Sequence, residues 1–228
     1  MRPDSPVEVP DEVARFAAGR PLECVWRNEL GGLTFAVRSS DYVKWSPPGV
    51  VDLGPEVERL AWAARHVVVP RVLTTGPNWF ATAALPGRSA VDPRWLAEPA
   101  TAVRALGRGL RLLHDALPVD GCPFPGRRGS GSRARGPVDD PPPVDRAVVC
   151  HGDACAPNTL LADDGAVVGH VDLGALGVAD RWADLAVATW STQRNYGPDW
   201  EEPLLDAYGV APDPERTAYY RRLWDLAD

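Results

Sequence analysis

The residues best suited to chemistry lie in one stretch of the second half of the chain. The motif HGD ends at Asp153, Asn158 follows five positions later, and Asp172 opens the motif DLG after two short apolar runs. A carboxylate can accept or orient the proton of an attacking hydroxyl group. An amide oxygen and a second carboxylate are ligands that suit Mg²⁺ on nucleotide phosphates. The spacing therefore predicts phosphoryl transfer, with Asp153 as the base and Asn158 and Asp172 as Mg²⁺ ligands.

Each of these residues, taken alone, also has a purely structural explanation. HGD could be a tight turn around a buried histidine, and Asp172 could cap the end of a strand. The combination is more informative, because protein kinases carry the same order of groups, H-R-D-x-x-x-x-N followed by D-F-G. The joint pattern favours the functional interpretation.

The first half of the chain supplies a candidate contact for nucleotide phosphates. Kinases hold these phosphates with a strand lysine that a helix glutamate positions. Lys44 is the only lysine of the chain and lies in a predicted strand, and Glu56 opens the predicted helix that follows. Glu58 is the rival partner, about 200° away around a helix. The alternative for Lys44 is a solvated surface charge, and the pair Gly31-Gly32 is only a weak signal for phosphate binding.

Hydrophobic periodicity indicates the elements that must position these groups. Residues 25–45 alternate in the manner of a β-hairpin. Apolar residues recur at helical spacing over 53–64. Two apolar runs, 67–73 and 79–85, are separated by turn-like residues at 74–78. The first half of the chain thus predicts a small sheet with one helix.

The second half changes character after Pro86, where helices replace strands. An amphipathic helix extends from near Pro99 to Pro118. The segment 125–146 is so poor in large apolar residues that we predict an exposed, flexible loop. Asp213 can cap the last predicted helix. Short strands are predicted over 147–150, 159–161 and 167–171, and helices over 180–190 and 213–226.

The charge of the chain argues against a nucleic-acid partner. Its 228 residues include 24 basic and 31 acidic side chains, a formal net charge of −7. Nucleic acids select a clustered positive surface instead. A cationic small molecule suits this balance better.

Targeting signals are not apparent in the sequence. The first thirty residues contain acidic side chains and no apolar segment typical of a signal peptide. No run approaches the ~18 apolar residues that a membrane span needs. The four cysteines form no CxxC pair, and we interpret them as reduced thiols. These features predict a cytoplasmic protein with no membrane partner.

Residues 22–228 resemble the aminoglycoside phosphotransferase family, in particular its 3'-phosphotransferases, the kanamycin kinases. The two most specific segments are HGDACAPN at 151–158 and VDLGALGVADRWADLAVAT at 171–189. The other segments that carry the resemblance are YVK at 42–44, residues 56–62, residues 78–87, LLH at 112–114 and CPF at 122–124.

The resemblance implies an α+β, two-lobed, protein-kinase-like fold that holds ATP in its cleft. Residues 1–86 would form an N-terminal nucleotide-binding lobe around a small antiparallel sheet. Residues 87–228 would form a mainly helical lobe for catalysis and acceptor binding. The family's roles carry over to matching positions in the second half of the chain: Asp153 would be the catalytic base, Asn158 and Asp172 would bind Mg²⁺, and His151 and Asp180 would support the catalytic loop.

In the first half of the chain, the resemblance implies that Lys44 and Glu56 position the phosphates. Tyr42 would stack on adenine, and backbone groups near Ala83 and Leu85 would contact the edge of the base.

The sequence departs from the family around the acceptor site. Relatives carry a helical hairpin between the CPF and HGD motifs, where this chain has only the polar stretch 125–150. Ala175 stands where relatives often have arginine. Of the acidic pair that grips substrate amines near the family's carboxyl terminus, Asp225 matches, and Asp228 is a further candidate. We expect the ATP chemistry to persist and the affinity for the acceptor to be reduced.

The predicted function is ATP-dependent phosphorylation of an aminoglycoside hydroxyl group, the 3'-hydroxyl in particular, which gives antibiotic resistance. One alternative is a kinase for another small alcohol, such as a macrolide or an amino-alcohol. Another is a nucleotide-binding protein with a degraded acceptor site. A protein kinase is disfavoured because the chain lacks an activation segment that ends in Ala-Pro-Glu.

Overall fold

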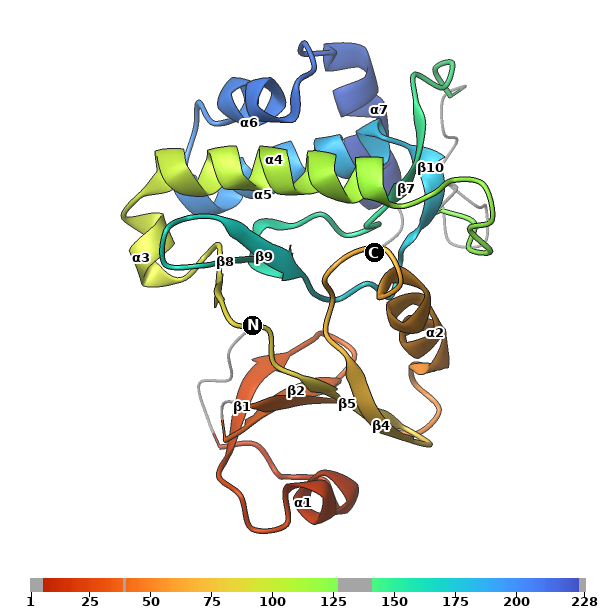
Figure 1. Cartoon of the computed structure of the whole chain (residues 1–228), viewed down its shortest axis with the longest axis vertical. Helices are drawn as coiled ribbons and strands as arrows, with labels where there is room; N and C mark the ends of the chain where they lie inside the picture. The colour runs from red at the N-terminus through yellow and green to blue at the C-terminus, as the bar shows by residue number, and fades with distance from the viewer. Residues whose placement is uncertain (1–5, 39, 127–140, 226–228) are drawn as a thin grey trace. The chain divides into compact units, whose positions relative to one another are not determined.

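A computed structural model describes residues 6–38, 40–126 and 141–225 (Figure 1). The chain divides into two compact units. The first unit contains residues 1–65 and 69–85, and the second contains residues 66–68 and 86–228. Most of the predicted loop 125–146 lies outside the described residues, since 127–140 belong to the gap.

The first unit is built on a five-stranded antiparallel sheet of strand order β1-β2-β3-β5-β4. Alternation of apolar residues along β2 puts Leu33, Phe35 and Val37 on one face. The helix α1 (Asp11–Ala17) covers this face with Val13 and Ala17, and these residues form one buried cluster. The strands are β1 (Leu22–Arg27), β2 (Leu33–Val37), β3 (Asp41–Trp45), β4 (Val72–Gly76) and β5 (Trp79–Ala83).

The structure corrects the predicted turn at 74–78. Strand β4 continues through Thr74 and Thr75 and pairs with β5. Threonine is a favourable strand residue because its branched side chain packs well on a pleated surface. The turn is therefore confined to Pro77 and Asn78, and it joins the two strands as a tight hairpin.

The helix α2 (Gly54–Ala63) forms where the periodicity predicts it, and it buries Leu60 of the predicted face but not the whole of that face. Ala61, one of the apolar residues that define the predicted face, is exposed, whereas Glu56 is buried. The cause is polar: Glu56 has an ion-pair partner that makes burial of its carboxylate tolerable.

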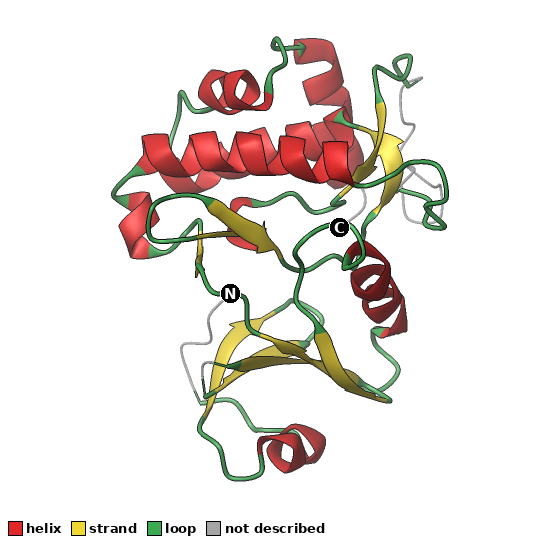
Figure 2. Ribbon diagram, viewed as in Figure 1, coloured by secondary structure: helices red, strands yellow, loops and turns green. Residues whose placement is uncertain are grey.

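The second unit is mainly helical (Figure 2). Its longest helix, α4 (Pro99–Ala116), lies where the amphipathic pattern predicts it and buries Leu106, Leu110 and Leu113. Asp213 caps the last helix, because its carboxylate accepts a hydrogen bond from the backbone N–H of Arg216 at 3.0 Å. The remaining helices are α3 (Pro93–Leu96), α5 (Trp182–Tyr196), α6 (Glu201–Tyr208) and α7 (Pro214–Asp225).

Two small antiparallel sheets in the second unit carry the motifs. Strand β7 (Ala147–Cys150), which precedes HGD, pairs with β10 (Gly177–Asp180). Strands β6 (Arg88–Ser89), β8 (Thr159–Leu161) and β9 (Val167–His170) form the other sheet. The 3-10 helix η1 (Ala156–Asn158) joins the HGD loop to β8.

The predicted α+β fold class is confirmed. The short elements α1, α3, α6, β6 and β10 were not predicted, because they are too short to show a clear hydrophobic periodicity. Within the described residues, no helix has the length and apolar character of a membrane span.

Candidate active site

The HGD loop is fixed by a buried carboxylate from helix α5. The side chain of Asp184 accepts hydrogen bonds from the backbone N–H of His151 at 2.6 Å and of Gly152 at 2.9 Å. Gly152 has a φ of +84°, and a Cβ at this position would collide with the carbonyl oxygen of Ala175. Only glycine meets both conditions at low cost. The backbone is thus held immediately before Asp153.

The ring of His151 joins this loop to the DLG segment. Its Nε2 lies 2.9 Å from the carbonyl oxygen of Val171, which can only accept, so Nε2 carries the proton. Its Nδ1 then accepts the backbone N–H of Asp153 at 3.3 Å. The ring of His151 therefore links the HGD loop to the segment that precedes Asp172.

Asp153 and Asn158 are held together by the amide group of the asparagine. Its Nδ2 donates to the backbone oxygen of Asp153 at 2.9 Å and to Oδ2 of the same residue at 3.1 Å. The other carboxylate oxygen, Oδ1 of Asp153, is buried and has no hydrogen-bond partner among the described residues. Buried polar oxygens are normally paired, so this oxygen is suited to a ligand that donates a hydrogen bond.

Asp172 adopts a backbone conformation that is unusual for its type. Its φ of +62° is left-handed, which costs a residue with a Cβ roughly 1–3 kcal/mol. A backbone hydrogen bond of 2.9 Å from Val171 to the oxygen of Asn158 brings the two segments together. The carboxylate of Asp172 and the side-chain oxygen of Asn158 are the hard oxygen ligands that Mg²⁺ prefers. These residues fit the predicted metal.

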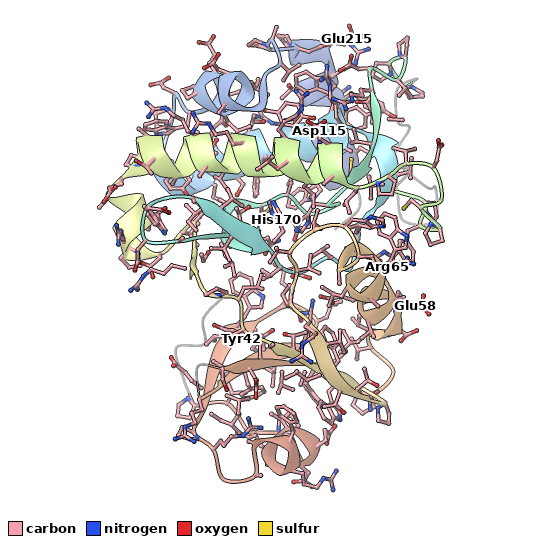
Figure 3. The ribbon with its side chains drawn as sticks, in the orientation of Figure 1. Tyr42, Glu58, Arg65, Asp115, His170 and Glu215 are labelled. Atoms are coloured by element: carbon pink, nitrogen blue, oxygen red, sulfur yellow. The ribbon has the colours of Figure 1, made fainter. Side chains whose placement is uncertain are left out.

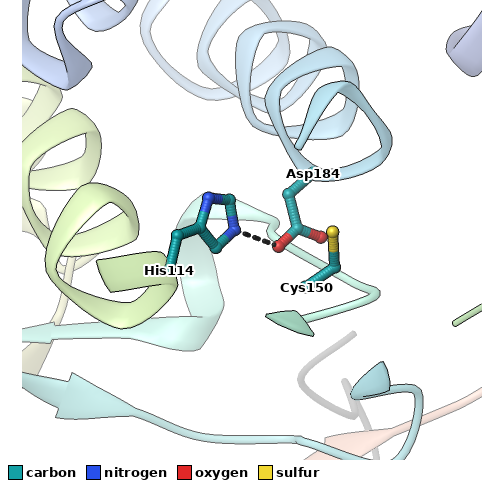
Figure 4. A group of neighbouring side chains, drawn as sticks. All are labelled: His114, Cys150 and Asp184. Carbon is teal, nitrogen blue, oxygen red and sulfur yellow. Dashed lines mark hydrogen bonds and ion pairs between the residues drawn. The ribbon is translucent and has the colours of Figure 1, made fainter. Parts of the chain in front are cut away.

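A second group of potential ligands is buried and consists of His114, Cys150 and Asp184, of which His114 and Asp184 are hydrogen-bonded to each other (Figure 4). Nε2 of His114 lies 3.0 Å from the carboxylate of Asp184, and its Nδ1 lies 2.9 Å from the hydroxyl oxygen of Tyr208. The thiol of Cys150 donates to the carbonyl oxygen of Asp180 at 3.3 Å. Burial raises the pKa of the Cys150 thiol well above its usual range, whereas metals bind the thiolate. The group is therefore structural.

Asp184 is the functional residue that motif reasoning missed. Burial opposes its ionisation, but hydrogen bonds from His114 and Gly152 outweigh burial and hold the pKa of the carboxyl below its usual range. The available signal was an aspartate within the apolar run WADLAVA, where a charge needs buried partners.

Asp180 supports a different segment from the one predicted. Its carboxylate accepts the backbone N–H of Asp145 at 2.7 Å and of Trp182 at 2.9 Å. It lies opposite Ala147 at the start of β7, four residues before the HGD motif. Asp180 therefore fixes the strand that leads to the loop and the first turn of α5.

In the first unit, the lysine and a glutamate form an ion pair. Nζ of Lys44 on β3 lies 2.7 Å from Oε2 of Glu56 on α2, and the Glu56 side chain is only 8% exposed. Glu58, on the same helix, is exposed (Figure 3). The helix therefore presents Glu56 and not Glu58 to the lysine.

The remaining predicted nucleotide contacts also belong to the first unit. Tyr42 lies two residues before Lys44 on β3, so both side chains point to one face of the sheet, and Tyr42 is 40% exposed. The backbone N–H of Ala83 is engaged with Arg71 at 2.9 Å. The N–H of Leu85 makes no hydrogen bond to the part of the chain that is described, which leaves it as the available donor.

The backbone amides of Gly31 and Gly32 are hydrogen-bonded within their own turn. The N–H of Gly32 donates to the side chain of Asn28 at 2.7 Å, and the N–H of Gly31 donates to its backbone oxygen at 3.2 Å. Neither amide is available to a phosphate. Of the predicted acceptor-site residues, Asp225 ends α7 without a described side chain, and Asp228 lies outside the described residues.

Sequence comparisons identify relatives of known activity. The model of the phosphotransferase enzyme family matches residues 25–140 and 137–220. The aminoglycoside 3'-phosphotransferase of Streptomyces fradiae is 34% identical over 212 residues, which cover 75% of this chain and 78% of the relative. The streptomycin 3''-kinase of Streptomyces griseus is 33% identical over 260 residues, which cover 91% of this chain and 93% of the relative. That alignment is longer than this chain, so the relative contains residues that this chain lacks.

Solved structures show the same fold. The aminoglycoside phosphotransferase APH(3'')-Id from Streptomyces rimosus superposes with a TM-score of 0.76 at 28% identity, covering 93% of this chain and 95% of that one. A complex of the same protein with ADP and streptomycin gives a TM-score of 0.70 at 27% identity, covering 88% of this chain and 94% of that one. The likeness confirms the predicted kinase-like fold.

Proposed function

The chain belongs to the phosphotransferase enzyme family, and we propose that it transfers the terminal phosphoryl group of ATP to a hydroxyl group of an aminoglycoside. The observation that carries this proposal is the buried, unpartnered Oδ1 of Asp153 on a rigidly held loop. Such an oxygen suits the hydroxyl group of an acceptor. Phosphorylation of that hydroxyl group would give resistance to the antibiotic.

Asp153 acts on the acceptor in the proposed reaction. Its Oδ1 accepts a hydrogen bond from the acceptor hydroxyl group, which orients the oxygen toward the γ-phosphorus. A bond forms between that oxygen and phosphorus, the bond between phosphorus and the bridging oxygen of ADP breaks, and the hydroxyl proton passes to the carboxylate. Asn158 restrains Asp153 because its amide bonds to Oδ2, which leaves Oδ1 for the acceptor.

The nucleotide needs positive charge, because its phosphates carry several negative charges. Lys44 supplies one such charge, and its ion pair with Glu56 limits the positions of Nζ. Asn158 and Asp172 would hold Mg²⁺, which neutralises phosphate charge when it is bound. Tyr42 would stack on adenine, and the free N–H of Leu85 would donate to the edge of the base.

The proposed acceptor position is the 3'-hydroxyl, as in the Streptomyces fradiae relative. A specific observation favours a second candidate, the 3''-hydroxyl of streptomycin. The streptomycin 3''-kinase aligns with 91% of the chain, whereas the 3'-phosphotransferase aligns with 75%. The net charge of −7 suits either polycationic acceptor.

A coupled assay of ADP release tests the proposal with ATP and Mg²⁺. The acceptors are kanamycin, a 3'-deoxy analogue of kanamycin and streptomycin, and the matched control is the Asp153→Asn variant. We expect turnover of kanamycin with an elevated KM and none of the 3'-deoxy analogue. NMR of the product then locates the phosphate.

Each other outcome has a definite meaning. Turnover of streptomycin alone would move the assignment to the 3''-hydroxyl. Turnover of the 3'-deoxy analogue would contradict the 3' assignment. Binding of MgADP without turnover of any acceptor would identify a nucleotide-binding protein with a degraded acceptor site.

A further inference from the structure

The sheet of the first unit has one face that α1 covers and a second face that is buried at β5 but partly exposed at β1 and β3. Leu33 and Phe35 on β2 point into the cluster that α1 covers. Side chains on the other face follow from the strand register, because directly opposed residues of antiparallel strands share a face. Trp26 on β1 lies opposite Thr34, and Thr34 lies opposite Lys44. Trp26 is therefore on the same face as the lysine.

Packing within the unit does not account for the position of Trp26. The residue is 48% exposed, although an indole ring is among the largest apolar side chains. The register of β1 against β2 shifts between Cys24 and Trp26. Such β-bulges re-aim side chains and are frequent beside functional sites. The bulge here turns Trp26 toward the face that carries Lys44 and leaves much of the ring uncovered.

The residues between Trp26 and β3 are small. Trp26 lies across Thr34 from Lys44, and Glu23 lies across Ala36 from Tyr42. Neighbouring strands are about 4.8 Å apart, so β1 and β3 are separated by roughly 10 Å. Trp26 and Tyr42 are therefore diagonal neighbours, with the small side chains of Thr34 and Ala36 between them. The indole suits the nucleoside part of a nucleotide whose phosphates lie at Lys44.

We propose that the indole of Trp26 packs against the adenosine moiety of the bound nucleotide. This inference rests on the proposed function for the identity of the nucleotide, and it adds a binding residue that no sequence motif supplies. The indole carries no charge, so it acts on the nucleoside and not on the phosphates. Loss of the indole weakens the binding of ligands that contain adenosine and leaves the binding of inorganic tripolyphosphate unchanged.

Calorimetric titration of the full chain with MgADP tests the assignment. The variants are Trp26→Ala and Trp26→Phe, and the control is Leu112→Ala, which truncates another exposed apolar side chain, 64% exposed, on α4. Stacking of a base on an aromatic residue contributes enough to predict an increase in Kd of about ten-fold for Trp26→Ala. Trp26→Phe should show a smaller increase, and Leu112→Ala less than about two-fold. The Kd for tripolyphosphate should stay the same in all variants.

Acrylamide quenching of tryptophan fluorescence distinguishes a loss of the proposed contact from misfolding of the variant. MgADP should shield one tryptophan of the wild type from acrylamide quenching, and Trp26→Phe should lose that shielded component. An unchanged Kd for MgADP in a folded Trp26→Ala variant would overturn the inference, as would equal losses for MgADP and tripolyphosphate. Failure of the proposed function looks different: the wild type itself would turn over no aminoglycoside, whatever the Trp26 variants do to MgADP binding.

Discussion

The two units hold their functional side chains by different means. In the second unit, the loop that carries Asp153 is fixed by two backbone hydrogen bonds to the buried carboxylate of Asp184 and by the ring of His151. In the first unit, Lys44 has an ion pair to Glu56, and its side chain remains 25% exposed. The loop that carries Asp153 is held by buried hydrogen bonds, whereas Lys44 is held by an ion pair and stays partly exposed.

This difference matches the roles proposed for Asp153 and Lys44. Proton acceptance and in-line attack need the reacting atoms within a few tenths of an ångström of their productive positions. Attraction between an ammonium group and a phosphate chain falls off slowly with distance and tolerates some movement. We therefore expect changes in the second unit to act mainly on kcat and changes in the first unit to act mainly on KM for ATP.

The largest effect is expected at Asp153. Asp153→Asn keeps the shape of the side chain but replaces the carboxylate, the proposed proton acceptor, by a neutral amide that is too weak a base, so kcat should fall by about 10²–10⁴-fold. Affinity for MgADP should change little, because the carboxylate serves the acceptor. Steady-state kinetics and calorimetry measure both quantities. Turnover within a few-fold of the wild type would exclude Asp153 as the base.

Asp184→Asn should be the next most severe change. The variant replaces one acceptor oxygen by an NH₂ group and removes a buried charge that several donors share, which should lower the free energy of unfolding by about 3 kcal/mol. The loop then shifts, and kcat should fall by about 10²-fold with KM for ATP nearly unchanged. Urea denaturation and kinetics test this. A stable variant with normal kcat would show that the loop does not depend on the helix α5.

The same carboxylate predicts how stability depends on pH. The folded protein lowers the pKa of Asp184, so its contribution to stability is complete above the ordinary value of about 4. That contribution is lost as the pH falls below about 4 toward the folded pKa. The wild type should therefore lose stability in acid more steeply than Asp184→Asn. Urea midpoints at several pH values measure the difference, and parallel curves for the two proteins would contradict it.

The smallest effects are expected in the first unit. Glu56→Gln removes the charged partner of Lys44, and KM for ATP should rise by about 5–10-fold with little loss of kcat. Glu58→Gln is the matched control on the exposed side of the same helix and should change KM by less than about two-fold. Equal effects of the two substitutions would mean that the ion pair does not position the lysine.

The features that could be predicted from the sequence are those whose residues lie close together in the chain. The order Asp153, Asn158, Asp172 spans a short stretch, and the short apolar runs beside these residues form β7, β8 and β9, so both the motif and its neighbouring strands could be predicted. Lys44 and Glu56 were also readable, because a strand and the next helix along the chain supply them.

The residues that escaped prediction depend on long-range contacts. Asp184 meets the HGD loop more than thirty positions away in the chain, and no periodicity marks such a contact. The exposed position of Trp26 follows from a bulge, which depends on pairing between β1 and β2. The role of Asp180 follows from the pairing of β7 with β10, two strands whose partners cannot be read from their own residues.

The left-handed backbone at Asp172 has an evolutionary consequence. An aspartate in this conformation is strained in a way that a glycine would not be. A population that grows without antibiotic selects only for a folded chain, so substitution to glycine at this position should be tolerated there. Exposure to the drug should reverse this tolerance, because glycine does not supply the carboxylate that is proposed to hold Mg²⁺. Position 172 should therefore record the history of drug exposure more sharply than a buried core position, where stability and activity favour the same residue.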